Sequence, residues 1–267
     1  MRMSEPSSPD AAPASKPIPA VSLSEPVAPK RGGFNPVAAG FLGVFLGLIA
    51  GIAIGTQSAP KPRERIVLNV QIQGQTAQII GEPVNGDPLE GARYVLGQKN
   101  ARVTMVEFGD YGCGYCRLYT LETFPKLKAE FVDTGKVQYA YRDTVSVGGE
   151  YTVRAAKIGN CVSRENFWQY HEAVFERREE WSQNATEQAE TLFKGIAQNA
   201  SSGGKTSDEF GTCAASSATE ADIQRDIAAA SSFGISGTPS FIINGYMFSG
   251  ALPLEVYREI FKKFGVS

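Results

Sequence analysis

Two cysteines three positions apart, Cys113 and Cys116, are the side chains of this chain best suited to chemistry. They follow an apolar run at residues 103–108 and stand where a helical pattern begins. Cysteines held one helical turn apart can close a small disulfide that a thiolate attacks and reopens. The spacing therefore predicts a redox-active pair and not a structural crosslink.

Cys113 is the expected nucleophile of this pair, because it stands at the start of the predicted helix. Unpaired backbone N–H groups and the helix dipole stabilise a thiolate there by up to about 2 kcal/mol, which lowers a thiol pKa from about 8.5 to near 7. Cys116 lies one turn further along, where we expect it to be more buried and to act as the resolving thiol. Gly114 and Tyr115, between the cysteines, bring no positive charge to the site.

A carboxyl group precedes the cysteines inside the apolar run. Glu107 lies between Val106 and Phe108, six residues before Cys113. Burial in a strand makes the charged form costly, so the pKa of Glu107 should rise into a range useful for proton exchange with Cys116. We expect Glu107 to act as the proton acceptor. A structural ion pair with a nearby Lys or Arg is the alternative.

The elements around these residues form an alternating α/β pattern. Residues 102–108 form a predicted buried strand, since they are mostly β-branched and apolar. A helix from about residue 115, restarted near Pro125, should stop near Gly135. A second strand at 137–141 completes the strand–helix–strand order expected of a parallel unit.

Residues 150–230 contain several helical patterns and no convincing strand pattern, which predicts a helical insertion. Cys161 and Cys213 both lie within it, and neither belongs to a CxxC motif. We expect them to form a structural disulfide, which would stabilise the domain by about 4 kcal/mol through closure of a loop of about fifty residues. Two free thiols are the alternative, because spacing alone does not establish pairing.

The chain returns to strand patterns at 240–243 and 246–249. Asn244-Gly245, between them, is the strongest short signal for a hairpin. A final amphipathic helix is predicted at 253–264. Its apolar side chains should face the core: Leu254, Tyr257, Ile260, Phe261 and Phe264.

This order of elements, together with its residues, resembles the thioredoxin fold, and the long helical insertion resembles the DsbA-like branch of the thiol-disulfide oxidoreductases. Residues 106–116 are similar to the active-site stretch of that family. Gly237-Thr238-Pro239, followed by a strand and Asn244-Gly245, is similar to its second signature. The resemblance extends from about Tyr94 to the C-terminus, so we expect a thioredoxin-like α/β domain at 94–267 with the insertion at 150–230.

The resemblance also implies roles for individual residues. The Thr238–Pro239 bond would be cis and face the two cysteines, so that the Thr238 backbone offers strand-like hydrogen bonds to an extended client. An ordinary turn proline is the alternative. Gly114 and Tyr115 would join Thr238 and Pro239 in binding substrate. Strongly oxidising DsbA-type members carry a His between the cysteines, whereas Gly-Tyr is the pair of the disulfide isomerase DsbC, so the direction of net electron flow stays open.

The N-terminal part of the chain has a different composition. Residues 1–33 are rich in Pro, Ser and Ala and predict a disordered cytoplasmic tail. Residues 37–55 carry no charge and as a helix would span about 28 Å, so we expect an uncleaved transmembrane helix within 34–57. A cleaved signal peptide is the alternative. Four glycines at a spacing of four would allow a second copy to pack closely and form a homodimer: Gly43, Gly47, Gly51 and Gly55.

Residues 58–93 should form a linker with a short strand or hairpin, since an alternating stretch at 66–72 precedes turn residues at 77–88. Basic residues flank the span on both sides and do not decide its orientation. All four cysteines lie after the span, and two cysteine pairs suit an oxidising compartment. We therefore expect residues 58–267 to lie outside the cytoplasm, anchored to the cell membrane.

A net charge of -2 and a pI near 5.7 give no sign of a nucleic-acid-binding surface. We expect a membrane-anchored thiol-disulfide oxidoreductase that introduces or exchanges disulfides in extracytoplasmic proteins. It would need no cofactor or metal, and its partners would be client proteins with cysteines and a redox partner that resets the pair. A disulfide isomerase or reductase of the same fold and a membrane-tethered, peptide-binding chaperone or adaptor are the alternatives. The cysteine spacing argues against a zinc site. A Cys–His hydrolase is not expected either, because the sequence shows no Asn or Asp partner for His171.

Overall fold

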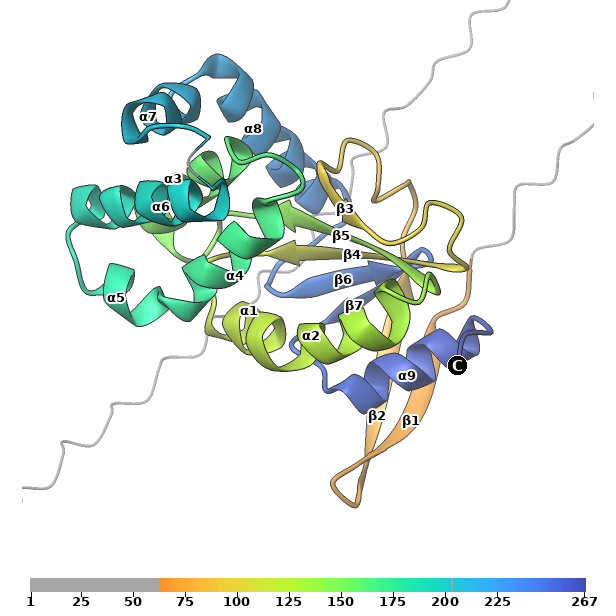
Figure 1. The fold of residues 1–267 in the computed structure, drawn as a ribbon. Helices are drawn as coiled ribbons and strands as arrows, with labels where there is room; N and C mark the ends of the chain where they lie inside the picture. Colours follow the sequence, from red (N-terminus) through yellow and green to blue (C-terminus); the bar gives the residue numbers. More distant parts are fainter. Residues whose placement is uncertain (1–62, 203) are drawn as a thin grey trace, which may run out of the picture. The chain divides into compact units, whose positions relative to one another are not determined.

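The computed structural model describes residues 63–202 and 204–267 (Figure 1). The predicted cytoplasmic tail, 1–33, and the predicted transmembrane segment, 34–57, lie outside these residues. Within the described part of the chain, no helix is both long and apolar enough to cross a bilayer. The transmembrane helix and the homodimer through its glycines stay predictions.

The described part of the chain is built around a seven-stranded mixed sheet (Figure 1). At its centre, β4 (Val103–Gly109) runs parallel to β5 (Val137–Asp143) and antiparallel to β6 (Ser240–Ile243). The parallel pair confirms the predicted strand–helix–strand unit. From edge to edge the order is β1 (Ile66–Ile72), β2 (Gln75–Pro83), β7 (Tyr246–Ser249), β6, β4, β5 and β3 (Tyr94–Leu96).

One helical run connects β4 to β5. Pro125 has no N–H to continue the hydrogen-bond ladder, and around it the run changes from π-helical to α-helical geometry, close to the predicted restart. Gly135, at φ +76, ends the run, and its N–H donates to the Val132 carbonyl at 3.0 Å. The run comprises α1 (Gly114–Leu118), the π-helical η1 (Tyr119–Thr123), α2 (Phe124–Leu127) and the π-helical η2 (Lys128–Val132).

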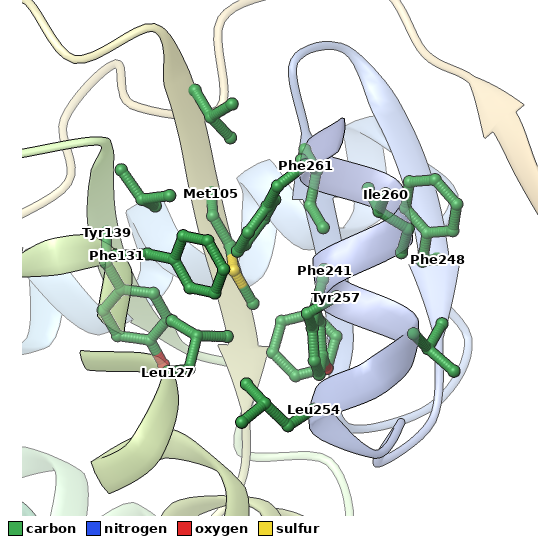
Figure 2. Close-up of a cluster of buried hydrophobic side chains, with 14 of the residues drawn as sticks. Met105, Leu127, Phe131, Tyr139, Phe241, Phe248, Leu254, Tyr257, Ile260 and Phe261 are labelled. Atoms are coloured by element: carbon green, nitrogen blue, oxygen red, sulfur yellow. The ribbon is translucent and has the colours of Figure 1, made fainter. Parts of the chain in front are cut away.

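The helical run and α9 (Leu254–Lys263) pack on the sheet and enclose the main hydrophobic core (Figure 2). The ring centroids of Phe131 and Phe261 lie 4.9 Å apart, and those of Phe241 and Tyr257 lie 5.4 Å apart, in edge-to-face contacts. Each large apolar side chain buried in this way stabilises the fold by about 1.5–3 kcal/mol. The predicted core face of α9 is confirmed: Leu254, Tyr257, Ile260 and Phe261 are buried, and Phe264 is partly buried.

Two hairpins enlarge the sheet. In the β6–β7 hairpin, Asn244 and Gly245 take positive φ angles of 47° and 83°, as a tight turn of this kind requires, which confirms the prediction. The Asn244 side chain also binds β4, since its Oδ1 accepts the Thr104 N–H at 2.8 Å. The β1–β2 hairpin turns at Gln73 and Gly74, whose φ angles are 49° and 80°.

Two features of the sheet differ from expectation. β2 continues through a segment where we expect turn residues, because Ile79 and Ile80 pair with Leu68 and Val67 and so extend the ladder. β2 also pairs with β7, so this hairpin belongs to the sheet. The sequence does not predict β3, because three residues are too few to show an alternating pattern.

The predicted helical insertion is confirmed and has a hydrophobic core of its own. Trp181 meets Phe193 edge-to-face with ring centroids 5.5 Å apart, and the Trp181 indole N–H donates to the Val174 carbonyl at 2.8 Å. The helices are α3 (Gly149–Asn160), α4 (Phe167–Glu176), α5 (Arg178–Ser182), α6 (Thr186–Ala200), α7 (Ser207–Ala214) and α8 (Ser217–Ser232).

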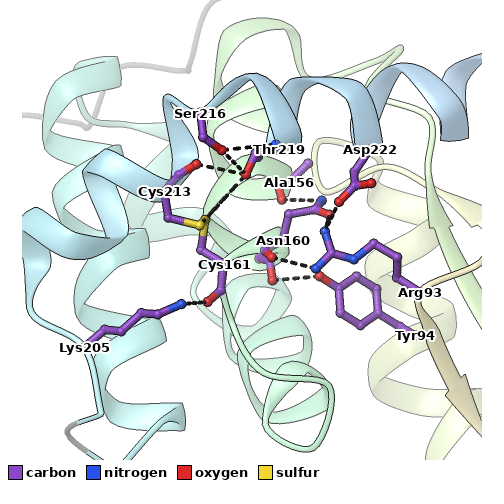
Figure 3. Close-up of a disulfide and its surroundings, with 11 residues drawn as sticks. Arg93, Tyr94, Ala156, Asn160, Cys161, Lys205, Cys213, Ser216, Thr219 and Asp222 are labelled. Carbon is purple, nitrogen blue, oxygen red and sulfur yellow. Dashed lines mark hydrogen bonds and ion pairs between the residues drawn. A yellow bond between two sulfur atoms is a disulfide. The ribbon is translucent and has the colours of Figure 1, made fainter.

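A disulfide joins Cys161, at the end of α3, to Cys213 of α7 (Figure 3). The two Cα atoms are 5.9 Å apart. The Thr219 hydroxyl of α8 lies 3.8 Å from the Cys161 sulfur and 3.9 Å from the Cys213 sulfur. The crosslink therefore connects α3 and α7 beside the start of α8, and it pairs two cysteines whose spacing alone left the pairing open.

A buried charge pair fastens the insertion to the sheet. Arg142 of β5 donates from Nε to Asp226 Oδ1 of α8 at 2.8 Å, and both residues are buried. Arg142 also donates from Nη1 to the carbonyls of Pro88 and Glu90, at 3.1 Å and 2.8 Å. One guanidinium thus connects β5, α8 and the segment before β3.

Candidate active site

The cysteine motif lies in the turn between β4 and α1. Cys113 is the N-cap residue of α1, and its N–H donates to the Asp110 carbonyl at 3.0 Å. Both Cys113 and Cys116 are free thiols. Cys113 is 6% exposed, whereas Cys116, one turn along, is completely buried. The helix start therefore leaves one sulfur within reach of solvent and holds the other in the core.

The two thiols differ strongly in acidity. A hydrogen bond with the Cys116 thiol lowers the pKa of Cys113 to about 5, against the effect of its burial, and contacts with Thr238 and with the backbone of Cys116 and Tyr115 act in the same direction. Burial raises the pKa of Cys116, and the neighbouring Cys113 and Glu107 add to this increase. At neutral pH Cys113 is therefore a thiolate, and Cys116 keeps its proton.

The second motif meets the first at Thr238. The Cys113 sulfur lies 3.2 Å from the Thr238 carbonyl oxygen, although the two residues are 125 positions apart. The Thr238–Pro239 bond is cis, and β6 begins directly after it. The Gly250 N–H donates to the Pro239 carbonyl at 2.8 Å, which ties this loop to the end of β7. The structure thus places Thr238 and Pro239 beside the expected nucleophile.

Glu107 is completely buried in β4. Burial raises its pKa to about 8, the hydrogen bond from Tyr139 acts in the opposite direction, and the charge of Cys113 adds to the increase. The Tyr139 hydroxyl, which donates to Oε2, is its side-chain partner among the described residues, so the structure shows a tyrosine where a Lys or Arg was the alternative. A carboxyl group with this pKa can accept and release protons near neutral pH.

The hydroxyl groups that surround Glu107 are not predicted from the sequence. The hydroxyls of Tyr119, Tyr141 and Tyr257 are buried and have no hydrogen-bond partner among the described residues. Burial raises the pKa of each tyrosine, and the charge of Glu107 adds to the increase. Glu107 is therefore the member of this cluster that titrates near neutral pH. The spacing of Tyr139 and Tyr141, which puts both on one face of β5, could have indicated such a cluster.

Asp110 organises the turn before Cys113, a role that is not predicted from the sequence. Its Oδ1 accepts the Gly112 N–H at 2.7 Å and the Thr152 hydroxyl at 2.6 Å, and its Oδ2 accepts the Val147 N–H at 2.6 Å. The carboxyl group therefore joins the cysteine turn to the loop that leads into α3. An Asp two residues before an N–H donor, at the end of a strand, is a typical turn pattern and could have indicated this role.

Exposed apolar side chains lie close to the cysteine turn. Tyr115 is 66% exposed, and Leu118, one turn along the helical run, is also exposed. Val147, in the loop bound by Asp110, is 57% exposed. Large apolar groups at a protein surface commonly mark sites that contact other polypeptides.

His171 has a structural role in this fold. Its Nδ1 lies 3.1 Å from the Tyr111 hydroxyl, and burial lowers its pKa to about 3, so the ring is neutral at physiological pH. Two of the four cysteines that a zinc site would need are joined in the Cys161–Cys213 disulfide. Within residues 63–202 and 204–267, no group of three or more His, Cys, Asp or Glu side chains could hold a metal ion.

Comparison with known sequences assigns this fold and site to a family. Residues 90–263 match the family model described as thioredoxin, which covers more than half of the chain, and the protein belongs to this family. Disulfide bond formation protein D of Bacillus subtilis is 35% identical over 105 residues, which are 38% of this chain and 47% of that protein. A putative protein-disulfide oxidoreductase of Rickettsia felis is 30% identical over 153 residues, which are 57% of this chain and 52% of that protein. The chain thus spans about half the length of the curated relatives it matches.

Solved structures agree with this assignment. Oxidised BdbD from Bacillus subtilis has a TM-score of 0.61 at 24% identity, over 68% of this chain and 98% of that chain, a likeness that concerns the fold. Alpha-DsbA1 from Wolbachia pipientis has a TM-score of 0.56 at 26% identity, over 64% of this chain and 90% of that chain. The DsbA-like resemblance and the thioredoxin-like α/β fold expected from the two motifs are confirmed.

Proposed function

We propose that this protein is a thiol-disulfide oxidoreductase that introduces disulfides into cysteine-containing polypeptides. The observation that carries the proposal is the difference between the two thiols: the pKa of Cys113 is lowered to about 5, and that of Cys116 is raised. A thiolate stabilised in the reduced protein makes the disulfide a stronger oxidant, by about 30 mV for each 1.4 kcal/mol. This supports oxidation of clients over the isomerase and reductase alternatives. The names of the two sequence relatives support the same class of reaction.

The reaction consists of two displacements. A client thiolate attacks the Cys113 sulfur of the oxidised pair, so the Cys113–Cys116 bond breaks as a client–Cys113 bond forms, and Cys116 leaves as a thiolate. A second client thiolate then attacks the client sulfur of this mixed disulfide, and Cys113 leaves as a thiolate. Two electrons pass from the client to the cysteine pair, and the client gains one disulfide.

Three neighbouring groups assist these steps. Glu107, whose pKa is raised to about 8, supplies a proton to departing Cys116 and takes it back when the pair is reoxidised. The Thr238 backbone, 3.2 Å from the Cys113 sulfur, is placed to pair with an extended client. Tyr115, which is exposed beside Cys113, adds an apolar contact surface, and Pro239, which is buried, adjoins the backbone that pairs with the client. A redox partner must reoxidise the pair, because each turnover leaves both cysteines reduced.

We further propose that the reaction takes place outside the cytoplasm. The Cys161–Cys213 disulfide supports this location, since such crosslinks persist in oxidising compartments. The apolar composition of residues 37–55 supports a membrane tether. Fractionation of cells that express the full chain tests the tether: we expect the protein in the membrane fraction, extracted by detergent and not by salt.

Trapping of clients tests the proposed activity. In cells that express the full chain, Cys116→Ala should accumulate mixed disulfides with client proteins through Cys113, because the thiol that reverses this bond is missing. Cys113→Ala is the matched control and should accumulate none. A peptide-binding adaptor would instead retain the same proteins with both variants, and a reducing agent would not release them.

Equilibration with glutathione distinguishes the possible directions of electron flow. For an oxidase we expect a potential near the oxidising extreme, about -120 mV, whereas a reductase would lie near about -270 mV. A value at the reducing end would overturn the oxidase assignment even if clients are trapped.

A further inference from the structure

A pocket of about 220 Å³ lies next to Thr238. Three segments form it: the loop after β5, the C-terminal half of α8, and the segment between α8 and β6. Their contributions include Thr144, Ser146, Ile227, Ser231, Ile235 and Thr238. Apart from the Thr238 backbone, no group that lines this pocket takes part in the reaction steps described above.

The lining of the pocket is mainly apolar, with hydroxyl groups at the surface. Ile227, Ala230 and Ile235 supply the aliphatic groups, and Ser146 and Ser231 are exposed. Each of the described residues that line the pocket is uncharged. A charged client side chain would lose hydration there without gaining an ionic partner, so the pocket favours an uncharged one.

The acidic residues adjacent to the lining in sequence do not change this preference. Asp226, next to Ile227, already pairs with Arg142 at 2.8 Å and accepts the Asp143 N–H at 3.3 Å. Burial raises the pKa of Asp143, as do the neighbouring acidic groups, which disfavours its charged form. Neither carboxyl group is therefore available to attract a basic client residue.

The pocket shares two of its three segments with the cysteine site. The Thr238 carbonyl is 3.2 Å from the Cys113 sulfur. The loop that carries Ser146 continues to Val147, whose N–H binds Asp110 in the cysteine turn. A client held at Cys113 therefore lies next to both of these segments.

An extended client would reach the pocket in a few residues. A chain that pairs with the Thr238 backbone continues along Gly237 and Ser236, which also line the pocket. Strand geometry advances about 3.3 Å per residue and alternates side chains between two faces. A residue within about two positions of the client cysteine is thus brought to the pocket.

We propose that this pocket binds one uncharged client side chain, of leucine to tyrosine size, adjacent to or two positions from the reacting cysteine. The proposal rests on the proposed function and adds a sequence preference to it. A volume of about 220 Å³ is below the range of about 300–1,000 Å³ typical of sites for drug-sized ligands, so it suits a single side chain. The aliphatic wall contacts the body of that side chain, and the serines tolerate a hydroxyl group.

A peptide series tests the preference. The oxidised full-length protein is mixed with peptides that contain two cysteines and differ only in the flanking residues: Leu, Tyr, Asp or Lys. We expect Leu and Tyr peptides to be oxidised about tenfold faster than Asp and Lys peptides, which is the discrimination typical of one apolar pocket. Equal second-order rate constants across the series would overturn the proposal.

Paired variants on α8 locate the effect. Ser231→Trp fills the pocket from an exposed position, and Ser232→Trp is the matched control, because Ser232 is also exposed but lines a different cavity. Ser231→Trp should slow oxidation of the Leu peptide about tenfold, and Ser232→Trp should leave it unchanged. Equal effects of the two variants would refute the assignment of the pocket.

A small dithiol separates failure of the pocket from failure of the activity. Dithiothreitol has no side chain for the pocket, so Ser231→Trp should oxidise it at the wild-type rate. If wild-type protein does not oxidise dithiothreitol, the proposed function itself fails. If dithiothreitol is oxidised normally but the peptides are not discriminated, the proposed function stands and the pocket assignment is wrong.

Discussion

The acidity of Cys113 has one largest cause, its hydrogen bond with Cys116, and this cause can be tested directly. A pKa of about 5, compared with 9.0 for an ordinary thiol, means that Cys113 is ionised almost completely at neutral pH. Because pH 7 lies two units above the pKa in the folded protein, ionisation of Cys113 stabilises the reduced protein by about 2.7 kcal/mol at pH 7. That gain corresponds to about 60 mV in the potential of the pair.

The largest cause of the lowered pKa is the hydrogen bond with Cys116, so its loss should have a measurable effect. Cys116→Ala removes the donor, whereas Cys116→Ser keeps a hydroxyl donor at the same position. A hydrogen bond to a charged group contributes about 1.5–3 kcal/mol. We therefore expect the pKa of Cys113 to be about one to two units higher in the alanine variant than in the serine variant.

Thiolate absorbance in the ultraviolet, recorded from about pH 3 to about pH 9, measures this pKa directly, because each variant has one free thiol at the site. Alkylation rates over the same pH range give an independent value. If the two variants share one pKa, or if the pKa of Cys113 in the serine variant lies near about 8.5, the hydrogen bond with residue 116 is not the cause of the acidity.

Three further predictions concern stability. The pKa of Glu107 is raised from 4.5 to about 8, so the free energy of unfolding of wild type should fall as pH rises between these two values. Glu107→Gln lacks this effect and should become more stable relative to wild type, by up to about 1.4 kcal/mol for each pH unit in that range. Replacement of both Cys161 and Cys213 by Ser should lower the free energy of unfolding by about 4 kcal/mol, since the crosslink closes a long loop. Asp110→Ala should cost at least about 2 kcal/mol, because it leaves the Val147 N–H and the Thr152 hydroxyl without their acceptor.

Denaturant unfolding measures all three effects. Reduced Cys113 makes stability rise with pH, opposite to the effect of Glu107, and it does so equally in wild type and in Glu107→Gln. The two proteins are therefore compared with each other at each pH. A difference that does not change with pH would contradict the assigned pKa of Glu107. Exposed Asp133 provides the control for Asp110, and Asp133→Ala should change stability by less than about 1 kcal/mol. If the variant without Cys161 and Cys213 is as stable as wild type, other contacts and not the disulfide restrict the segment between these residues.

Most of the fold could be predicted from local patterns. The apolar run at β4, the Asn244-Gly245 turn and the periodic face of α9 are each encoded within about ten residues, and the structure confirms them. β3 and the true extent of β2 depend on pairing with distant strands, namely β5, β1 and β7. Propensity within the segment itself does not contain that information.

The residues of the candidate site also differ in whether a local pattern predicts them. Cys113 and Cys116 are recognisable because their spacing is itself the chemical feature. The partner of Glu107 is not, because Tyr139 belongs to another strand and reaches the carboxyl group only across the sheet. Asp110 is polar and adjacent to a strand, but its bond to Val147 depends on where the loop before α3 lies. Roles that depend on one motif were predictable, whereas roles that depend on a fold-specific neighbour were not.

The buried ion pair of Arg142 and Asp226 limits which part of the protein can change conformation when a client binds. Breaking a buried ion pair costs about 3–5 kcal/mol, so the Arg142–Asp226 pair opposes movement of α8 away from β5. We therefore expect α8 to keep its position on this side of the client path. The opposite side of the client path is the short loop that carries Ser146 and Val147. Buried Asp110 holds its backbone at the Val147 N–H, so adjustment to clients of different shape falls to the exposed side chains of this loop.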